Sequence, residues 1–157
     1  MTSDFAFVLG TGRCGSTLVH EVLARHPDVG FVSNIEDRFP VPAFLGRWNN
    51  DIYRHVPEPF TRKGRMRFAP SEGYRLLNRT VSPVLSTPFR DLEAEDVTPW
   101  LSARTTRFFQ ERARIQDKPL FLHKFTGWPR SGFLQRILPD AGTGKRSSML
   151  ETKPTSG

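Results

Sequence analysis

The first thirty residues alternate between apolar runs and an amphipathic stretch. Phe5 to Leu9 is a continuous apolar run, which is typical of a strand buried on both faces of a parallel sheet. After a glycine-rich turn, Ser16 is a good N-cap, and apolar residues then recur at the spacing of one helix face up to Leu23. Pro27 ends this helix, and Val29 to Val32 predicts a second short strand. The pattern predicts strand, glycine loop, helix and strand.

The second half of the chain repeats this order of elements. Thr98, followed by Pro99 at the first helical position, predicts the start of a helix that runs to about Gln116. Leu120 to Lys124 then predicts a short strand, and a helix from Ser131 to Leu138 follows it. The residues expected on the buried face of the long helix are Leu101, Thr105, Phe108, Phe109 and Ile115. Two such units predict an α/β fold with a parallel sheet.

The segment between these units has little periodicity. From Ser33 to about Phe68 prolines interrupt the chain, so we expect a long excursion with short helices at most. Ser71 is expected to cap a further helix that runs through Arg79.

The end of the chain is polar. Gly142 to Gly157 offers only Met149 and Leu150 to a core, so no further strand is expected there. We therefore expect an α/β domain over residues 1–141, incomplete at its C-terminal end, and a polar tail over residues 142–157 that is either disordered or out of register with the family of this domain. A missing strand would also leave one edge of the sheet unpaired.

Composition and charge restrict the class of protein. A chain of 157 residues is long enough for one domain, and a single Cys excludes an intramolecular disulfide and Cys-based zinc sites. No stretch approaches the ~20 apolar residues of a membrane span, and the chain starts without the features of a secretory signal. We therefore expect a cytoplasmic protein with no membrane span. The net charge of +7 makes an anionic partner plausible.

The glycine-rich turn matches two phosphate-binding patterns. Gly10, Gly12 and Gly15 fit G-x-G-x-x-G, and they also fit the start of G-x-x-x-x-G-K-[ST], with Ser16 in place of Lys and then Thr17. In both patterns, successive backbone N–H groups and the helix N-terminus bind one anion.

Neither pattern is complete in this sequence. A dinucleotide site needs an acidic residue about 20 residues later, a place that Glu36 and Asp37 fill only approximately. A nucleoside triphosphatase needs the missing Lys and a later Asp for magnesium. What remains is a phosphate loop with Arg13 inside it and the hydroxyls of Ser16 and Thr17 after it.

Two stretches resemble one family. Phe7 to Val29, FVLGTGRCGSTLVHEVLARHPDV, resembles the 5′-phosphosulfate loop and helix of bacterial-type sulfotransferases that use 3′-phosphoadenosine 5′-phosphosulfate (PAPS). Leu120 to Ala141 resembles the later strand, Lys-containing turn and helix of that family. The resemblance implies a P-loop-like three-layer fold and transfer of a sulfuryl group from PAPS to a hydroxyl or amine, with PAPS as co-substrate and no metal. It covers less than a third of the chain.

The resemblance also implies roles for single residues. Arg13 falls where the family has a cation that touches the sulfuryl group and the bridging oxygen. Glu36, after the second strand, would take the acceptor proton, or it is a surface carboxylate. His123 and Lys124 are weaker candidates for substrate contacts. The positions that would bind the co-substrate are Gly12, Arg13, Cys14, Gly15, Ser16 and Thr17, with Cys14 as a small structural residue.

The chain departs from the family after Ala141. The strand and the Arg and Ser that hold the 3′-phosphate are not recognisable there, so we expect a truncated or degenerate member. Other hypotheses are a non-catalytic phosphate-binding protein and a nucleotide kinase-like phosphotransferase. The basic segment from Arg47 to Arg79 suggests nucleic acid only weakly, because no nucleic-acid module accompanies it. We expect a small nucleotide and an acceptor as partners, and no nucleic acid.

Overall fold

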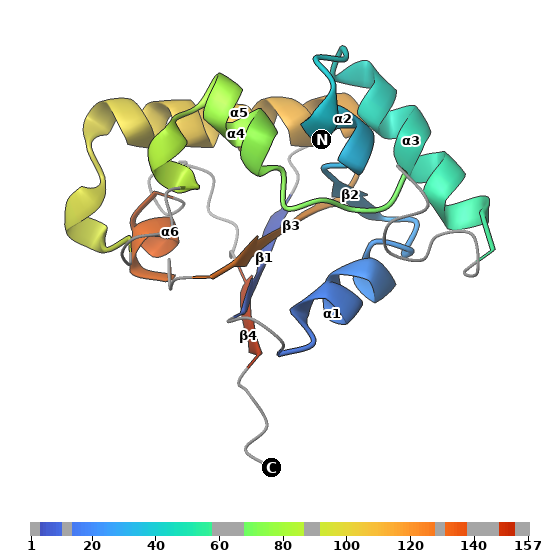
Figure 1. Ribbon diagram of the computed structural model, residues 1–157, viewed down its shortest axis with the longest axis horizontal. Coiled ribbons are helices and arrows are strands. Elements are labelled where there is room, and N and C mark those ends of the chain that lie inside the picture. The colour runs from blue at the N-terminus through green and yellow to red at the C-terminus, as the bar shows by residue number, and fades with distance from the viewer. Residues whose placement is uncertain are drawn as a thin grey trace.

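Four parallel strands form the centre of the fold (Figure 1). The computed structural model describes residues 4–10, 14–57, 68–86, 92–127, 131–137 and 148–152. The strands lie in the order β2-β3-β1-β4, with bounds β1 (Asp4–Gly10), β2 (Val29–Phe31), β3 (Leu120–Thr126) and β4 (Ser148–Thr152). The predicted α/β class with a parallel sheet is confirmed.

Alternate side chains of β1 enter two different hydrophobic cores. Phe7 and Leu9 belong to the larger core, which contains most of the buried phenylalanines. Ala6 and Val8 belong to a smaller core on the opposite face of the sheet. Both faces are therefore buried, which explains why the sequence of this strand is continuously apolar.

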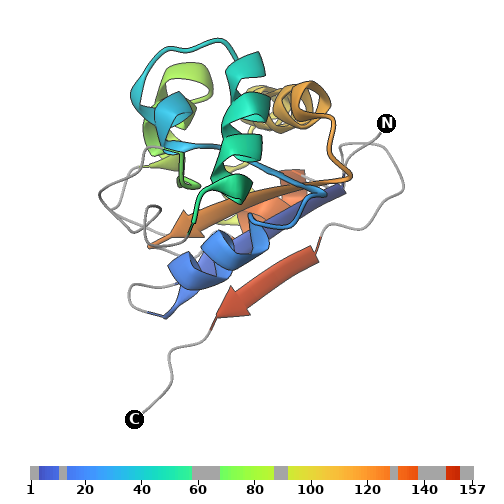
Figure 2. The ribbon, with the colours of Figure 1, turned by 90° about the vertical axis from the view of Figure 1, so that its right-hand side faces the viewer.

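Helices cover both faces of the sheet (Figure 2). Helix α1 (Ser16–Leu23) packs Val19 and Leu23 on the smaller core. The larger core lies under α4 (Tyr74–Thr80), α5 (Pro99–Gln116) and α6 (Ser131–Ile137). Helices α2 (Asn34–Arg38) and α3 (Phe44–His55) follow β2, and α3 packs against β2 and α5. The described residues also include two short 3-10 helices, Pro83–Leu85 and Ala94–Asp96.

Helix α5 has the bounds that its end signals predict. The Thr98 hydroxyl accepts a hydrogen bond from the Leu101 N–H at 3.2 Å, and Pro99 occupies the first helical position. Asp117, with φ 50°, ends the helix in the left-handed conformation. Four of the five residues predicted on its inner face are buried, and Ile115 is half-buried.

Phe109 lies at the centre of the aromatic core. Its side chain is fully buried, and its ring lies 5.3 Å from that of Phe7 and 5.2 Å from the imidazole of His123. Further rings within 6.4 Å belong to Phe5, Phe108 and Phe121. Edge-to-face packing of this kind joins α5 to both central strands.

Three local predictions were wrong. The excursion after β2 contains α3, a helix of 12 residues, because the stretch between its prolines is long enough for three turns. Helices α1 and α4 take glycines as N-caps, Gly15 and Gly73, instead of Ser16 and Ser71. Both glycines have positive φ, a backbone conformation that glycine adopts readily and serine rarely does.

The expectation of a tail without a strand was also wrong. Ser148–Thr152 forms β4 and pairs in parallel with β1, from Ala6 opposite Ser148 to Gly10 opposite Thr152. The hydrogen bonds of such pairing come from the backbone, so a polar composition does not prevent it. The edge of β1 is therefore covered, and the other residues of 142–157 lie outside the described ranges. In the described ranges, no helix is both long and apolar enough to cross a membrane.

We expect Phe109→Ala to lower the free energy of unfolding by about 3–5 kcal/mol, because the truncation leaves a cavity in the aromatic core. Urea denaturation followed by circular dichroism measures this change. Leu18→Ala is the control, since that side chain is 64% exposed on α1 and its loss should cost less than about 0.5 kcal/mol. Equal effects of the two substitutions would contradict the packing described here.

Candidate functional site

The carboxyl ends of the two central strands lie side by side. Gly10, the last residue of β1, is opposite Thr126, the last residue of β3, and the Gly127 N–H donates to the Gly10 carbonyl at 3.2 Å. The glycine loop leaves β1 at this edge and enters α1. Ligand sites of open α/β sheets gather outside the carboxyl ends of the strands. The edge formed by β1 and β3 is therefore the candidate site.

The start of α1 is open to an anion. Gly15 has φ 78°, a Cβ built there meets no atom within 4 Å among the described residues, and no side chain caps the helix in that part of the chain. Within the described residues, the N–H groups of its first turn therefore have no side-chain acceptor, and such N–H groups at a helix N-terminus can bind an anion. Ser16 is buried, and Cys14 and Thr17 are half-buried.

Two predicted site residues, Gly12 and Arg13, lie outside the described residues. Their roles stay predictions.

Lys124 joins β3 to the first turn of α1. Its ammonium donates to the Thr17 hydroxyl at 2.7 Å and forms an ion pair with Glu72 at 2.9 Å between Nζ and Oε1. The Lys124 side chain is only 4% exposed. The structure thus brings together Thr17 and Lys124, two predicted site residues that are 107 positions apart.

Sequence reasoning missed Glu72. Its second carboxylate oxygen accepts a hydrogen bond from the Thr126 hydroxyl, so the residue contacts β3 at two positions. Nothing near Glu72 in the sequence signals these contacts, because both partners lie more than 50 residues away. Glu72 therefore becomes the acidic member of the site.

The backbone around Glu72 is fixed on several sides. Ser71 N–H donates to the Val32 carbonyl at 2.8 Å, beyond the end of β2. Gly73 has φ 64°, and a Cβ there would lie 3.2 Å from Val32 and 3.3 Å from His123. The Tyr74 hydroxyl donates to the carbonyl of Thr126 at 2.7 Å. These contacts hold the segment against the ends of β2 and β3.

His123 lies in the aromatic core rather than at the open edge. It is fully buried against Phe7, Phe109 and Phe125, and neither ring nitrogen has a hydrogen-bond partner among the described residues. Burial lowers the pKa of His123 to about 3, against a smaller opposing effect from the Glu72 backbone. Burial also lowers the pKa of His20, on α1. Both imidazoles are therefore neutral in the folded protein at neutral pH.

Glu36 is buried under the helical layer. Its carboxylate forms an ion pair with Arg112 of α5, and its other oxygen accepts hydrogen bonds from the backbone N–H and the hydroxyl of Ser33, both at 3.0 Å. The side chain is 1% exposed, so it is not the surface carboxylate considered as an alternative. Burial raises the pKa of Glu36, although Arg112 and Ser33 act in the opposite direction.

A local signal for these contacts exists in the sequence. Ser33 and Glu36 have the S-x-x-E spacing of a capping box, and the structure contains both hydrogen bonds of that motif at the start of α2. Gly46 of α3 lies directly against the carboxylate, since a Cβ there would be 2.6 Å from Oε1. The ion pair with Arg112 has no local signal, because 76 positions separate the two residues.

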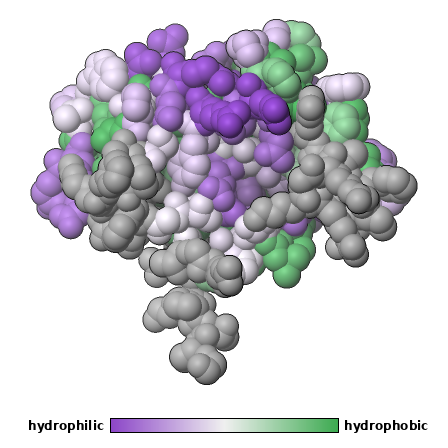
Figure 3. Space-filling view, viewed as in Figure 1, coloured by the Kyte–Doolittle hydropathy of each residue, from purple (hydrophilic) through white to green (hydrophobic). Residues whose placement is uncertain are grey.

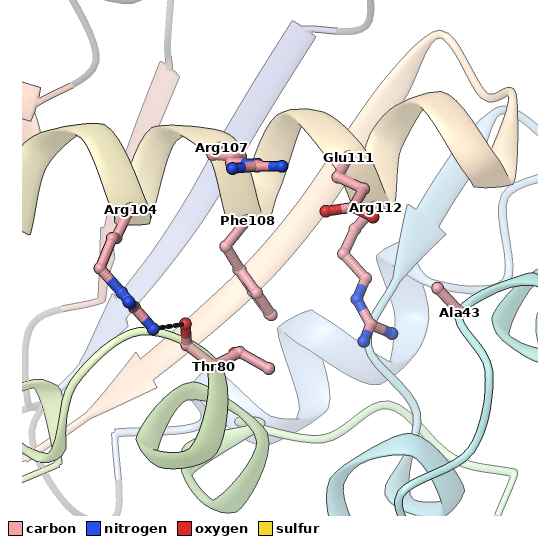
Figure 4. Close-up of a pocket in the computed structure, with 7 residues that line it drawn as sticks. All are labelled: Ala43, Thr80, Arg104, Arg107, Phe108, Glu111 and Arg112. Carbon is pink, nitrogen blue, oxygen red and sulfur yellow. Dashed lines mark hydrogen bonds between the residues drawn. The ribbon is translucent and has the colours of Figure 1, made fainter.

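A groove of about 350 Å³ lies in the helical layer (Figure 4). Arg104 donates to the Thr80 carbonyl at the end of α4, at 2.6 Å, and Arg112 binds Glu36. These two guanidiniums therefore join helices. The lining residues come from α4, α5 and the residue before α3, and they are Ala43, Thr80, Arg104, Arg107, Phe108, Glu111 and Arg112. The groove is thus built by the helical layer alone.

The face seen in Figure 3 carries hydrophilic residues over α4, whose exposed positions include Arg75, Asn78 and Arg79. Within the described ranges, no three His, Cys, Asp or Glu side chains lie close enough together to hold a metal ion.

Comparison with known proteins gives one match. The model of a family described as the sulfotransferase family matches residues 6–142, which include the glycine loop, Glu72 and Lys124. No curated protein and no solved structure matches the chain.

We expect Arg112→Met to lower the free energy of unfolding by about 3–5 kcal/mol, because it leaves the Glu36 carboxylate buried without a cation. The double variant Glu36→Gln/Arg112→Met should recover part of this loss. Arg114→Met, an exposed change on the same helix, is the control, with an expected effect below about 0.5 kcal/mol. Urea denaturation measures all three variants. If Arg112→Met behaves like Arg114→Met, the ion pair does not hold α2 to α5.

We expect His123→Phe to change how stability depends on pH. The folded-state pKa of His123 is about 3, below its ordinary value of 6.5, so the unfolded chain binds a proton that the folded chain excludes. The free energy of unfolding therefore decreases as the pH falls from about 6.5 towards 3. In His123→Phe this decrease should be smaller, because the phenyl ring binds no proton in either state. Denaturation at a series of pH values measures the effect. His55→Gln, at an exposed position, is the control. If the free energy of unfolding of His123→Phe changes with pH as steeply as that of the wild type, the prediction is refuted.

Proposed function

The chain belongs to the sulfotransferase family, and we propose on that premise that it transfers a sulfuryl group from PAPS to a hydroxyl or amine acceptor. The observation that carries this proposal is the contact of Lys124 with Thr17 at the carboxyl ends of β1 and β3. In this contact a buried cation lies beside the first turn of α1, and this supports the proposal that the charge of the transferring group develops there.

The start of α1 supports a site for the 5′-phosphate. The N–H groups of the first turn, which no side chain caps in the described residues, and the Thr17 hydroxyl are donors suited to a phosphate, and the positive end of the helix dipole favours its charge. Among the described residues, no atom lies within 4 Å of a Cβ built at Gly15, which supports close approach of an anion to the backbone. Cys14, Gly15 and Ser16 would contribute to the site by their place in the loop, as would Gly12.

Lys124 is suited to the chemical step. Sulfuryl transfer leaves negative charge on the bridging oxygen of the 5′-phosphate, and a fixed cation beside this oxygen stabilises the charge. Because Lys124 is almost wholly buried, its interaction with that charge is little screened by water. Arg13 would add a second cation from within the loop.

Glu36 is the proton acceptor that the family resemblance suggests. In the structure its two carboxylate oxygens are bound by Arg112 and Ser33. Because its side chain is only 1% exposed, an acceptor would reach it only after the surrounding side chains move. Its contacts with α2 and α5 give it a structural role that does not depend on catalysis.

We expect the protein to bind adenosine 3′,5′-bisphosphate, the product of PAPS, in isothermal titration calorimetry. Lys124→Met and Arg13→Ala should each weaken binding roughly 10- to 150-fold, since each removes charge-assisted hydrogen bonds worth about 1.5–3 kcal/mol. Lys118→Met is the matched control, because Lys118 precedes β3 at the opposite end of the strand and lies 3.8 Å from Asp51.

The outcomes separate the candidate functions. No binding at millimolar ligand, or binding that neither Lys124→Met nor Arg13→Ala weakens, would refute the proposed site. Binding without a sulfated product would indicate a nucleotide-binding protein without transferase activity. Magnesium-dependent turnover of ATP would indicate a phosphotransferase.

A further inference from the structure

We infer that Glu72 is the group that takes the proton from the acceptor during sulfuryl transfer. This inference rests on the proposed function, because it assigns a role at the same edge of the sheet. It differs from the family resemblance, which places the base at Glu36.

Glu72 lies beside the cation that faces the transferring group. Its Oε1 is 2.9 Å from the Lys124 ammonium, which in turn is 2.7 Å from the Thr17 hydroxyl. Two polar contacts thus link Thr17, in the first turn of α1, through Lys124 to the carboxylate of Glu72. An acceptor that attacks a sulfuryl group held next to Lys124 would have its hydroxyl within reach of Glu72.

Glu72 is also accessible from outside, unlike Glu36. Its side chain is 31% exposed, whereas that of Glu36 is 1% exposed. The known donors to Glu72, Lys124 and Thr126, occupy only part of the lone pairs of a carboxylate. A substrate hydroxyl can therefore donate to Glu72 without breaking the contacts that hold it.

The other candidate bases are less suited to this role. His123 and His20 are buried and neutral, and His123 faces the aromatic core. The Tyr74 hydroxyl is engaged with the backbone of Thr126. In the described part of the chain, Glu72 is the carboxylate that forms an ion pair with Lys124.

The step is balanced in atoms and charge. The acceptor oxygen uses a lone pair to form a bond to sulfur, and the bond between sulfur and the bridging oxygen of PAPS breaks. The electron pair of that bond leaves on the 5′-phosphate of adenosine 3′,5′-bisphosphate, next to the Lys124 cation. The proton of the acceptor moves to a carboxylate oxygen of Glu72 and later passes to water.

Glu72→Gln tests this role, since the amide keeps an oxygen for Lys124 but does not take a proton. The assay follows release of adenosine 3′,5′-bisphosphate from PAPS, with a panel of phenols, alcohols and amines, and with water alone. We expect turnover to fall about 100-fold or more, while calorimetric affinity for adenosine 3′,5′-bisphosphate changes less than about 3-fold. Glu72→Asp, which keeps a carboxylate, should retain more turnover than Glu72→Gln.

Two further variants make the result specific. Glu95→Gln, an exposed change on the 3-10 helix Ala94–Asp96, should keep wild-type turnover. Glu36→Gln should retain far more turnover per folded molecule than Glu72→Gln.

Each other outcome overturns the inference. Wild-type turnover in Glu72→Gln would show that Glu72 does not take the acceptor proton. If Glu36→Gln loses turnover while Glu72→Gln stays active, Glu36 is the base. An equal fall of affinity and turnover would show that Glu72 only positions Lys124. In these cases the wild type still transfers the sulfuryl group, so the proposed function stands. If the wild type neither binds the nucleotide nor releases it from PAPS, the proposed function itself fails.

Discussion

The register between β1 and β3 is the constraint on which the rest of the structure depends. The two strands pair in parallel from Asp4 opposite Leu120 to Gly10 opposite Thr126. Because successive side chains of a strand point to opposite faces, a slip by one residue would turn Lys124 away from α1 and into the aromatic core. The contact between Thr17 of α1 and Lys124 exists only in the observed register.

The aromatic core supports that register. Phe7, Phe109 and Phe125 pack around His123, so a shifted β3 would bring a cation into a space that contains phenyl rings. The Lys124 ammonium would lose its hydration there, which makes the shifted register unfavourable by several kcal/mol. The packing that stabilises the fold therefore also selects the arrangement of the site, although no phenylalanine belongs to the site itself.

The sequence predicts those features whose causes are local. The apolar run of β1 and the N-cap of α5 at Thr98 depend on neighbouring residues, and the structure contains both. Glu72 was not predicted, because its partners are brought to it by strand pairing and not by chain proximity. The pairing of β4 was missed for a similar reason, since backbone hydrogen bonds leave little trace in composition. The roles of Gly12 and Arg13 still rest on resemblance.

Because α3 lies close to α2, the residue types that three distant positions can accept in related sequences depend on one another. Gly46 has no room for a side chain, because the carboxylate of Glu36 occupies the space and is itself held by Arg112. A relative with alanine at position 46 would need a shorter acid at position 36 or a shifted helix. A relative that loses the cation at position 112 would need a neutral residue at position 36. In an alignment of relatives, these three positions should therefore change together, independently of the acceptor that each protein uses.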